Sequence, residues 1–384
     1  MLEGITVLDL ASVGPAARAS RWLADYGADV VKIAPVPNRG GVLIDPPFHS
    51  YGGHRGMRRM LVDLKSDAGR EAFLRVARGA DVLIESFRPG VVDTLGIGYG
   101  ALAAANPGIV YCSTSGYGQD GPHAQYAGHD LNYLAVGGFL ATSHPRDDGG
   151  PPVPGATVAD SAGGGMHAVI AILAALVNRA STGAGAYLDV AAADGVLALM
   201  SLAVDEYLAT GIVPGPRHGL LTGRYACYDV YRCADDAWVA VAAIEPRFYA
   251  NLCRALDCER WIDHQTDDDA QPEIRADFAA AFANKTRDQW SDLLAPADTC
   301  VSPVLTVPEV VEHPQFVARG AFVEATHATH GRFRQTGAVL AGQSRPPGVV
   351  GLPDTSQTDT DVLLRDAGYT GEDITRLRND GAVA

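Results

Sequence analysis

The chain has 384 residues, of which 47% are hydrophobic and 20% are charged, and this composition excludes a disordered or fibrous protein. Its formal charge of −15 argues against nucleic acid or an anionic membrane as the main partner. The first residues lack the pattern of a signal peptide and the apolar run Ala168–Val177 is too short for a bilayer, so we expect a cytoplasmic protein.

The first half of the chain alternates strand and helix patterns. The predicted strands are Ile5–Leu10, Ala28–Ile33, Asp81–Glu85, Ile109–Ser113 and Tyr187–Val190. The predicted helices run from Pro15 to near Gly27, over Asp67–Arg78, and from Asp160 to Val177. Short apolar strands separated by segments of helix length indicate right-handed crossovers. We therefore predict an α/β fold with a doubly wound parallel sheet.

The second half has a different pattern. A Gly- and Pro-rich linker is expected over 211–224, followed by a hairpin of Tyr228–Tyr231 and Trp238–Ala242. Helices are expected near Pro246–Leu256, Ile274–Ala283 and Arg287–Leu294. These patterns divide the chain into a large domain over 1–210, a small α+β domain over 225–318 and a C-terminal part over 319–384. That last part should follow the surface and end in a short helix over Asp361–Asp366.

Several common motifs are missing from the sequence. Neither GxGxxG nor GxxxxGK[ST] stands at a strand-to-helix turn, which argues against the usual dinucleotide and P-loop sites. The six cysteines form no CxxC pair and have no metal-ligand spacing with histidine. We expect buried, reduced thiols and no metal site.

Three side chains are candidates for chemistry, and each also has a structural explanation. Asp160 precedes Gly163-Gly164-Gly165 at a helix start, where it is either an N-cap or a base beside bare N–H donors for an oxyanion. His129 lies at a loop-to-helix junction, either as a cap or as an acid or base near pH 7. Glu245 precedes a proline at a helix start, where a negative charge is favourable in any case.

Basic residues gather between positions 39 and 88. The nine are Arg39, Arg55, Arg58, Arg59, Lys65, Arg70, Arg75, Arg78 and Arg88. Six acidic residues interleave with them, so nine minus six gives a local charge of +3 in an acidic chain. The cluster is either a set of solvated helix faces with i,i+4 pairs or a site for phosphate groups.

The sequence resembles the class III CoA-transferase superfamily, the CaiB/BaiF group. The matching segments are Gly4–Leu10, Gly27–Ile33, Asp63–Ser66, Asp81–Gly90, Tyr117–Pro122, Ile172–Leu176, Cys233–Asp236 and His313–Gln315. The resemblance implies acyl-CoA thioester substrates, with coenzyme A as part of the substrate and no permanently bound cofactor. It also implies an interlaced homodimer. In each chain, the N- and C-terminal parts would build a Rossmann-like large domain.

Within this superfamily, the chain is most similar to the α-methylacyl-CoA racemase branch. That branch carries a Gly-His-Asp-[Ile/Leu]-Asn-Tyr motif, here Gly128–Tyr133, and a Glu-Pro pair, here Glu245-Pro246. The resemblance implies that His129 and Asp160 move the α-proton of a 2-methylacyl-CoA, that Glu245 orients the imidazole, and that Gly163–Gly165 donate N–H groups to the enolate. The expected CoA ligands are Arg39, Arg58, Lys65 and Arg88.

Two other functions stay open. In the CoA-transferases of the superfamily, the aspartate at the position of Asp160 attacks the thioester and carries the acyl group and then CoA. The segment Asp160-Ser161-Ala162 departs from the Asp-Phe-Gly of racemases and favours this alternative. A non-catalytic CoA-binding protein would need a broken set of acid and base residues, whereas His129, Asp160 and Glu245 are all present.

Overall fold

The computed structural model describes residues 1–11, 13–37, 47–50, 54–339, 348–354 and 357–384. The chain forms two compact units. The first contains Met1–Gly137, Pro154–Ser201 and Pro314–Ala384, and the second contains Gly138–Val153 and Leu202–His313. Both are built from segments that are distant in the sequence.

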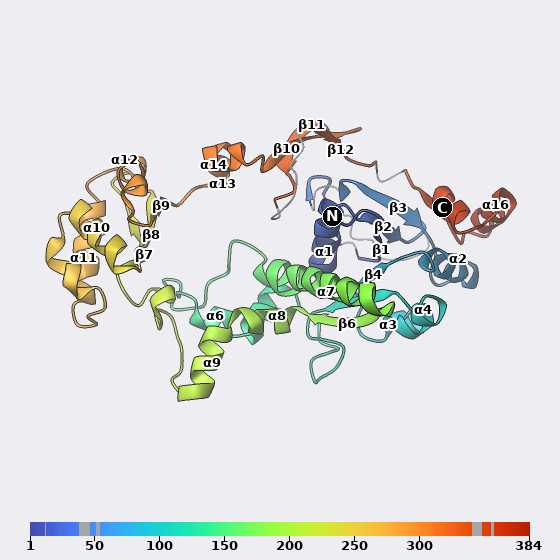
Figure 1. Cartoon of the computed structure of the whole chain (residues 1–384), viewed down its shortest axis with the longest axis horizontal. Helices are drawn as coiled ribbons and strands as arrows, with labels where there is room; N and C mark the ends of the chain where they lie inside the picture. Colours follow the sequence, from blue (N-terminus) through green and yellow to red (C-terminus); the bar gives the residue numbers. More distant parts are fainter. Residues whose placement is uncertain (12, 38–46, 51–53, 340–347, 355–356) are drawn as a thin grey trace. The chain divides into compact units, whose positions relative to one another are not determined.

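A six-stranded parallel sheet forms the centre of the first unit. Its strands are β1 (Thr6–Asp9), β2 (Asp29–Ala34), β3 (Met57–Leu61), β4 (Val82–Glu85), β5 (Val110–Ser115) and β6 (Ala186–Ala191), blue to green in Figure 1. The spatial order is β3-β2-β1-β4-β5-β6. Strand order reverses between β1 and β4, and ligands of such sheets bind outside the carboxyl ends of the strands near this reversal. The predicted parallel sheet is confirmed, with one strand more than expected.

That additional strand is β3, whose sequence is Met57-Arg-Arg-Met-Leu61. It pairs in parallel with β2 at the edge of the sheet, with Val31 opposite Arg58 and Ile33 opposite Met60. The sequence analysis predicts no strand here and places Arg58 and Arg59 in the basic cluster. An edge strand can expose charged side chains, so its sequence lacks the continuous apolar run of a central strand.

Helices cover both faces of this sheet. The helices of the first unit are α1 (Gly14–Asp25), α2 (Asp67–Ala77), α3 (Val91–Thr94), α4 (Tyr99–Ala105), α5 (Asp130–Val136), the π-helix Ala159–Met166, α7 (His167–Thr182), α8 (Ala192–Leu199), α14 (Pro314–Ala318), α15 (Thr360–Asp366) and α16 (Gly371–Asn379). One core cluster joins the sheet to α1 and α7, for example Val7 to Leu23 and Ile172. The opposite cluster joins Leu8 to Phe73 of α2 and to residues of α15 and α16. The last two helices thus belong to the core of the sheet.

The π-helix and α7 form one continuous helix of 24 residues, Ala159–Thr182. Its mean hydropathy of 1.5 over a window of membrane-spanning length satisfies the length and composition of a membrane span. The apolar segment is therefore longer than our prediction from Ala168–Val177. One side of the helix packs on the sheet through Ala168 and Ile172, which are fully buried, whereas only 39% of the apolar window as a whole is buried.

The C-terminal part also contains a small sheet that the sequence did not predict. Strands β10 (Phe322–His327) and β11 (Gly331–Thr336) form a hairpin, and β12 (Val349–Gly351) pairs in parallel with β10. Arg55 ties this sheet to the rest of the first unit, since its guanidinium donates to Gln335 Oε1 at 2.6 Å and to the Thr336 carbonyl at 2.9 Å. Arg55, a member of the basic cluster, is thus a buried structural residue.

The second unit contains the predicted hairpin. Strands β7 (Tyr228–Arg232), β8 (Trp238–Ala242) and β9 (Val301–Pro303) form an antiparallel sheet in that order. Its helical segments are α6 (Phe139–Thr142), α9 (Ser201–Thr210), η3 (Leu220–Thr222), α10 (Pro246–Ala255), η4 (Glu259–His264), α11 (Gln271–Phe282), α12 (Arg287–Leu294), η5 (Ala295–Ala297) and α13 (Val307–Glu312). Aromatic side chains fill the core, among them Tyr231, Phe282 and Trp290.

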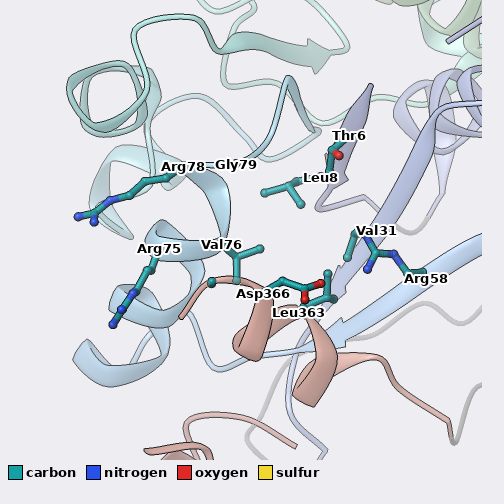
Figure 2. A pocket seen from close by; sticks show the side chains of 11 residues that line it. Thr6, Leu8, Val31, Arg58, Arg75, Val76, Arg78, Gly79, Leu363 and Asp366 are labelled. Carbon is teal, nitrogen blue, oxygen red and sulfur yellow. The ribbon is translucent and has the colours of Figure 1, made fainter. Parts of the chain in front are cut away.

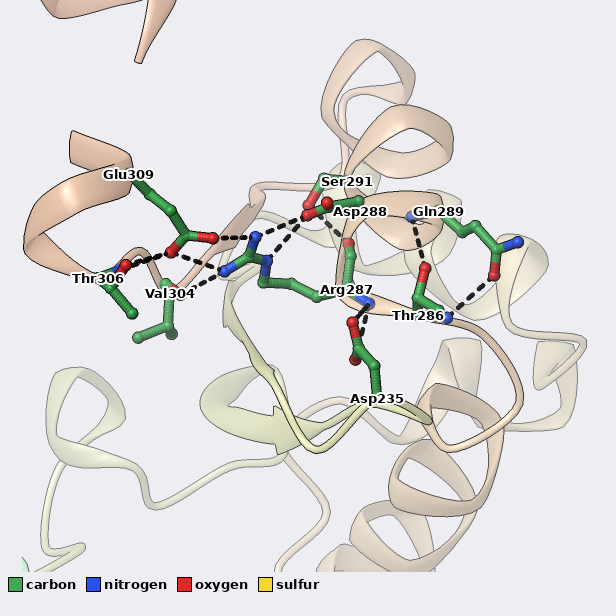
Figure 3. A network of polar contacts seen from close by, with 9 residues as sticks. All are labelled: Asp235, Thr286, Arg287, Asp288, Gln289, Ser291, Val304, Thr306 and Glu309. Atoms are coloured by element: carbon green, nitrogen blue, oxygen red, sulfur yellow. Dashed lines mark hydrogen bonds and ion pairs between the residues drawn. The ribbon is translucent and has the colours of Figure 1, made fainter. Parts of the chain in front are cut away.

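A polar network joins α12 to α13 in this unit (Figure 3). The Arg287 guanidinium donates to both carboxylate oxygens of Glu309, at 2.6 and 3.1 Å. Glu309 also accepts from the N–H of Thr306 at 2.7 Å, which caps α13. These contacts lower the pKa of Glu309 to about 2, with the Arg287 hydrogen bonds as the largest cause. The network stabilises the charged form of a half-buried carboxylate.

The unit boundaries differ from the predicted domains. The change back to the first unit comes after His313 rather than after residue 318, and Gly138–Val153 joins the second unit. The expected linker 211–224 belongs to the second unit together with most of α9. Cys300 is exposed, against our expectation, whereas Cys112, Cys227, Cys233, Cys253 and Cys258 are buried free thiols.

Candidate active site

Asp160 lies in the first turn of the π-helix, at the carboxyl edge of the sheet. Two contacts place it there: Gly164 packs on Pro15, which follows β1, and Gly163 packs on Ala192, which follows β6. The N–H of Asp160 donates to Asp130 Oδ1 at 2.8 Å, so the first residue of α5 caps the start of the π-helix. Single π-turns within longer helices are frequent at functional sites.

The electrostatic surroundings of Asp160 raise the pKa of its carboxyl group. Partial burial is the largest cause, followed by the negative charge of Asp130. The positive charges of Arg18 and His129 oppose this effect. A raised pKa brings a carboxyl group closer to the range in which it can both accept and return a proton.

His129 is the residue before α5, and its side chain takes no part in the cap. Its backbone N–H donates to Asn132 Oδ1 at 3.0 Å, which leaves the imidazole free of that role. The ring is exposed, and a positive charge on it acts on the Asp160 carboxylate. The structure thus brings together the two residues that we predicted to exchange protons with the substrate.

Tyr133 fixes the turn that presents His129, a role that the sequence analysis missed. Its hydroxyl donates to the Gly128 carbonyl at 2.6 Å. A Cβ added to Gly128 or Gly116 would lie 2.7 or 2.5 Å from the Tyr133 ring, so both positions require glycine. Burial and the charge of Asp160 raise the pKa of Tyr133 to about 12. The available signal was the motif Gly128–Tyr133, which contains the tyrosine.

The three glycines after Asp160 have a packing role that the sequence analysis did not predict. A Cβ at Gly164 would lie 2.6 Å from Pro15 Cβ, and one at Gly165 would lie 3.0 Å from the Trp22 ring. Gly163 meets Gly195 of α8, where an added Cβ would lie 1.9 Å from the Gly163 carbonyl oxygen. All three glycines are buried and lie after the first turn of the helix. At these positions the backbone N–H groups point towards the carbonyl groups of the preceding turn. This arrangement gives no support to their role as enolate donors.

Glu245 belongs to the second unit and is the residue before α10. It is exposed, and its side chain does not cap the helix. Its negative charge contributes to raising the pKa of Cys300, after the larger effect of burial. Its action on His129 stays a prediction.

The structure separates the predicted CoA ligands. Lys65 follows β3 and Arg88 follows β4, so both are exposed near the carboxyl edge, whereas Arg39 lies outside the described residues. The turn before Arg88 is fixed by Glu85, whose carboxylate accepts the N–H of Phe87 at 2.7 Å. Arg88 therefore stands close to the reversal of strand order between β1 and β4.

Arg58 instead faces the amino-terminal part of the sheet. Its guanidinium binds Asp29, the first residue of β2, with Nε at 3.0 Å from Oδ1. It lines a cavity of about 630 Å³ together with Leu8, Val31 and Asp366 (Figure 2). Figure 2 also shows that Arg75 and Arg78 extend from the opposite side of this cavity. Arg58 is thus placed apart from Asp160 and Arg88.

Among the residues that the structure describes, no group of three or more His, Cys, Asp or Glu side chains could hold a metal ion. The chemistry that this site offers is proton transfer by a carboxyl and an imidazole group, or nucleophilic attack by the carboxylate.

Comparison with protein families and curated proteins gives consistent results. The family described as CoA-transferase family III matches residues 2–353. The chain is 33% identical to human alpha-methylacyl-CoA racemase over 387 residues, covering 100% of this chain and 97% of that protein. It is 32% identical to acetyl-CoA:oxalate CoA-transferase of Acetobacter aceti over 339 residues, covering 84% of this chain and 85% of that protein.

Solved structures agree with these similarities. A CaiB/BaiF family protein from Brucella suis matches with a TM-score of 0.74 and 28% identity, over 95% of this chain and 99% of that one. A Mycobacterium tuberculosis protein in an orthorhombic crystal form matches with a TM-score of 0.78 and 26% identity, over 94% of this chain and 98% of that one.

Proposed function

Because this chain belongs to CoA-transferase family III, we propose that it acts on acyl-CoA thioesters and interconverts the (R) and (S) forms of 2-methylacyl-CoA. One observation carries the proposal: the N–H of Asp160 donates to Oδ1 of Asp130, the residue next to His129, and the Tyr133 hydroxyl fixes the turn before His129. Acid and base groups on opposite sides of one carbon atom are what a 1,1-proton transfer requires.

The reaction is balanced without any further reagent. One group, as imidazole or carboxylate, takes the α-proton, and the electron pair of the C–H bond moves into the bond to the thioester carbon to form an enolate. The other group, in its protonated form, returns a proton to the opposite face. The two groups have then exchanged protonation states, and they reset by proton exchange with water. The raised pKa of Asp160 favours its use both as a base, when ionised, and as an acid, when protonated.

The remaining members of the site complete this proposal. Glu245 would orient the imidazole of His129, and coenzyme A would enter as part of the substrate. Lys65 and Arg88 are our preferred ligands for its phosphate groups because they stand near the carboxyl edge of the sheet. Arg58 is less suited to this role, since it is engaged with Asp29 elsewhere.

We further propose a homodimer, as the family resemblance implies. In the first unit, α7 exposes Ile170 and Val177, which are 64% and 74% accessible. In the second unit, α9 exposes Leu202 and Leu208, which are 78% and 73% accessible. Large apolar side chains grouped on exposed helix faces favour burial against another chain.

A CoA-transferase activity is the alternative, because several CoA-transferases match most of the chain at 28–32% identity. In that reaction, the Asp160 carboxylate attacks the thioester carbonyl and expels CoA thiolate, which leaves a mixed anhydride. The thiolate then attacks the Asp160 carbonyl of that anhydride, which forms an aspartyl-CoA thioester and releases the first acid. The acceptor carboxylate attacks this thioester and expels CoA thiolate to form a second anhydride. The thiolate attacks the acceptor's acyl carbonyl in that anhydride, which gives the new acyl-CoA and frees the Asp160 carboxylate. This sequence needs Asp160 but gives His129 no proton to move.

The experiment is incubation with a 2-methylacyl-CoA in D₂O, with α-proton exchange followed by NMR or mass spectrometry. We expect exchange of both epimers, and its loss in Asp160→Asn and His129→Ala. No exchange across several chain lengths would contradict the racemase proposal. A screen of free acids as CoA acceptors then tests the alternative, for which His129→Ala should retain transfer and ¹⁸O from the acid should enter Asp160.

A further inference from the structure

Arg18 of α1 is joined to the start of the Asp160 helix across a long distance in the sequence. Its guanidinium Nη2 donates to Thr157 Oγ1 at 2.6 Å, and these residues are 139 positions apart. The aliphatic part of Arg18 runs along the π-helix, because a Cβ added to Gly165 would lie 3.1 Å from Arg18 Cβ. Glycine at position 165 therefore leaves room for the arginine beside the turn that carries Asp160.

The charge of Arg18 favours the ionised form of Asp160. Burial and the neighbouring carboxylate of Asp130 both disfavour the ionised form of Asp160, and the Arg18 cation is the larger of the two effects that oppose them. His129 is the smaller one, and its charge is lost when it acts as a neutral base. Arg18 is a permanent cation, since arginine stays protonated in proteins.

The other titratable side chains around this helix have separate roles. Tyr133 of α5 lies near Asp160, but its hydroxyl donates a hydrogen bond to the Gly128 carbonyl. Arg21 and Asp25 of α1 pair with each other. Asp194 of α8 acts on Asp189. His167 begins α7, after the π-helix.

We propose that Arg18, held beside the start of the π-helix by Thr157 and by the space at Gly165, is a positioning residue that keeps the Asp160 carboxylate ionised. Its hydrogen bond to Thr157 anchors the guanidinium, and its charge offsets that of Asp130. Without it, a half-buried carboxylate beside a second carboxylate would take up a proton and could no longer act as a base. The consequence for turnover rests on the proposed function, but the effect on Asp160 does not.

The test titrates Asp160 directly. The infrared difference spectrum between each protein and its Asp160→Asn derivative gives the fraction of protonated carboxyl at each pH. For Arg18→Met, which keeps the length of the side chain and removes the charge, we expect the Asp160 titration to move to higher pH by about one unit or more. Arg18→Lys should restore most of the shift because it restores the charge.

Arg179→Met is the matched control. Arg179 is a partly buried arginine in the same unit that pairs with Asp81 at 2.8 Å, and its loss should leave the Asp160 titration unchanged. Thr157→Val is the second variant, in case Arg18→Met does not fold. It removes the acceptor of Arg18, and we expect a smaller shift in the same direction. An unchanged Asp160 titration in Arg18→Met overturns the proposal. Where Arg18→Met does not fold, an unchanged titration in Thr157→Val does the same. The proposal is also overturned if the titration in Arg18→Lys is shifted as far as in Arg18→Met.

The same variants separate this inference from the proposed function. In the pH profile of α-proton exchange, the acidic limb should move to higher pH in Arg18→Met and return in Arg18→Lys, whereas general damage would lower the rate at every pH. If the wild-type protein exchanges no α-protons, the proposed function fails and the infrared titration still decides the role of Arg18.

Discussion

Gly195 of α8 packs against the backbone of Gly163 in the helix that carries Asp160, and Gly195→Ala tests this contact. The added Cβ would lie 1.9 Å from the Gly163 carbonyl oxygen and 2.4 Å from its Cα. Both are backbone atoms, so no side-chain rotation relieves the overlap, and α8 or the π-helix must move. Gly195 has no positive φ, so alanine is otherwise acceptable at this helical position.

The expected magnitude combines two opposing effects. Alanine favours a helix interior by up to about 1 kcal/mol over glycine. Overpacking typically costs about 1–3 kcal/mol, and a backbone contact belongs at the upper end of that range. The net loss in the free energy of unfolding is then about 2 kcal/mol, which for a domain of this size lowers Tm by roughly 4–8 °C. Displacement of Asp160 by about 1 Å should reduce exchange on the order of 100-fold.

The assay is thermal unfolding together with α-proton exchange. Gly100→Ala is the control, because this residue of α4 has no atom within 4 Å of the added Cβ. We expect Gly100→Ala to raise Tm slightly and to leave exchange unchanged. A Tm for Gly195→Ala equal to or above that of the wild type would refute the close contact. A lowered Tm with unchanged exchange would refute its link to Asp160.

Two further predictions concern pH. Asp130→Asn retains an oxygen that can accept the Asp160 N–H but removes a charge that raises the Asp160 pKa. The acidic limb of the pH profile of α-proton exchange should therefore move to lower pH. A shift to higher pH would contradict this. The lowered pKa of Glu309, about 2 against 4.5 for an ordinary glutamate, contributes stability that is complete above pH 4.5 and is lost as pH falls towards 2. The Tm of Glu309→Gln should therefore lie further below that of the wild type at pH 6 than at pH 3, and an equal difference at both would exclude the Arg287 pair as the cause.

The sequence by itself determined the central sheet and the choice of His129 and Asp160 as candidate proton-transfer groups. Strands β1, β2, β4 and β5 each contain a run of two or three adjacent apolar residues because both faces of the sheet are covered, and such runs are visible without a structure. The helices between them begin at local signals, such as Ser66, whose hydroxyl caps α2. Asp160 and His129 could be identified from the sequence because each lies in a short motif of adjacent residues.

Tertiary structure decided what depends on contacts between distant segments. Edge strand β3 exists because β2 pairs with it, although its own sequence is rich in arginine. The glycines after Asp160 suggested open N–H donors, but the neighbours that fill their Cβ positions come from α1 and α8. Arg18 reaches Thr157 from 139 positions away, and Arg58 faces Asp29 rather than the site. No local sequence pattern predicts these contacts, because they form only when the folded chain brings distant segments together.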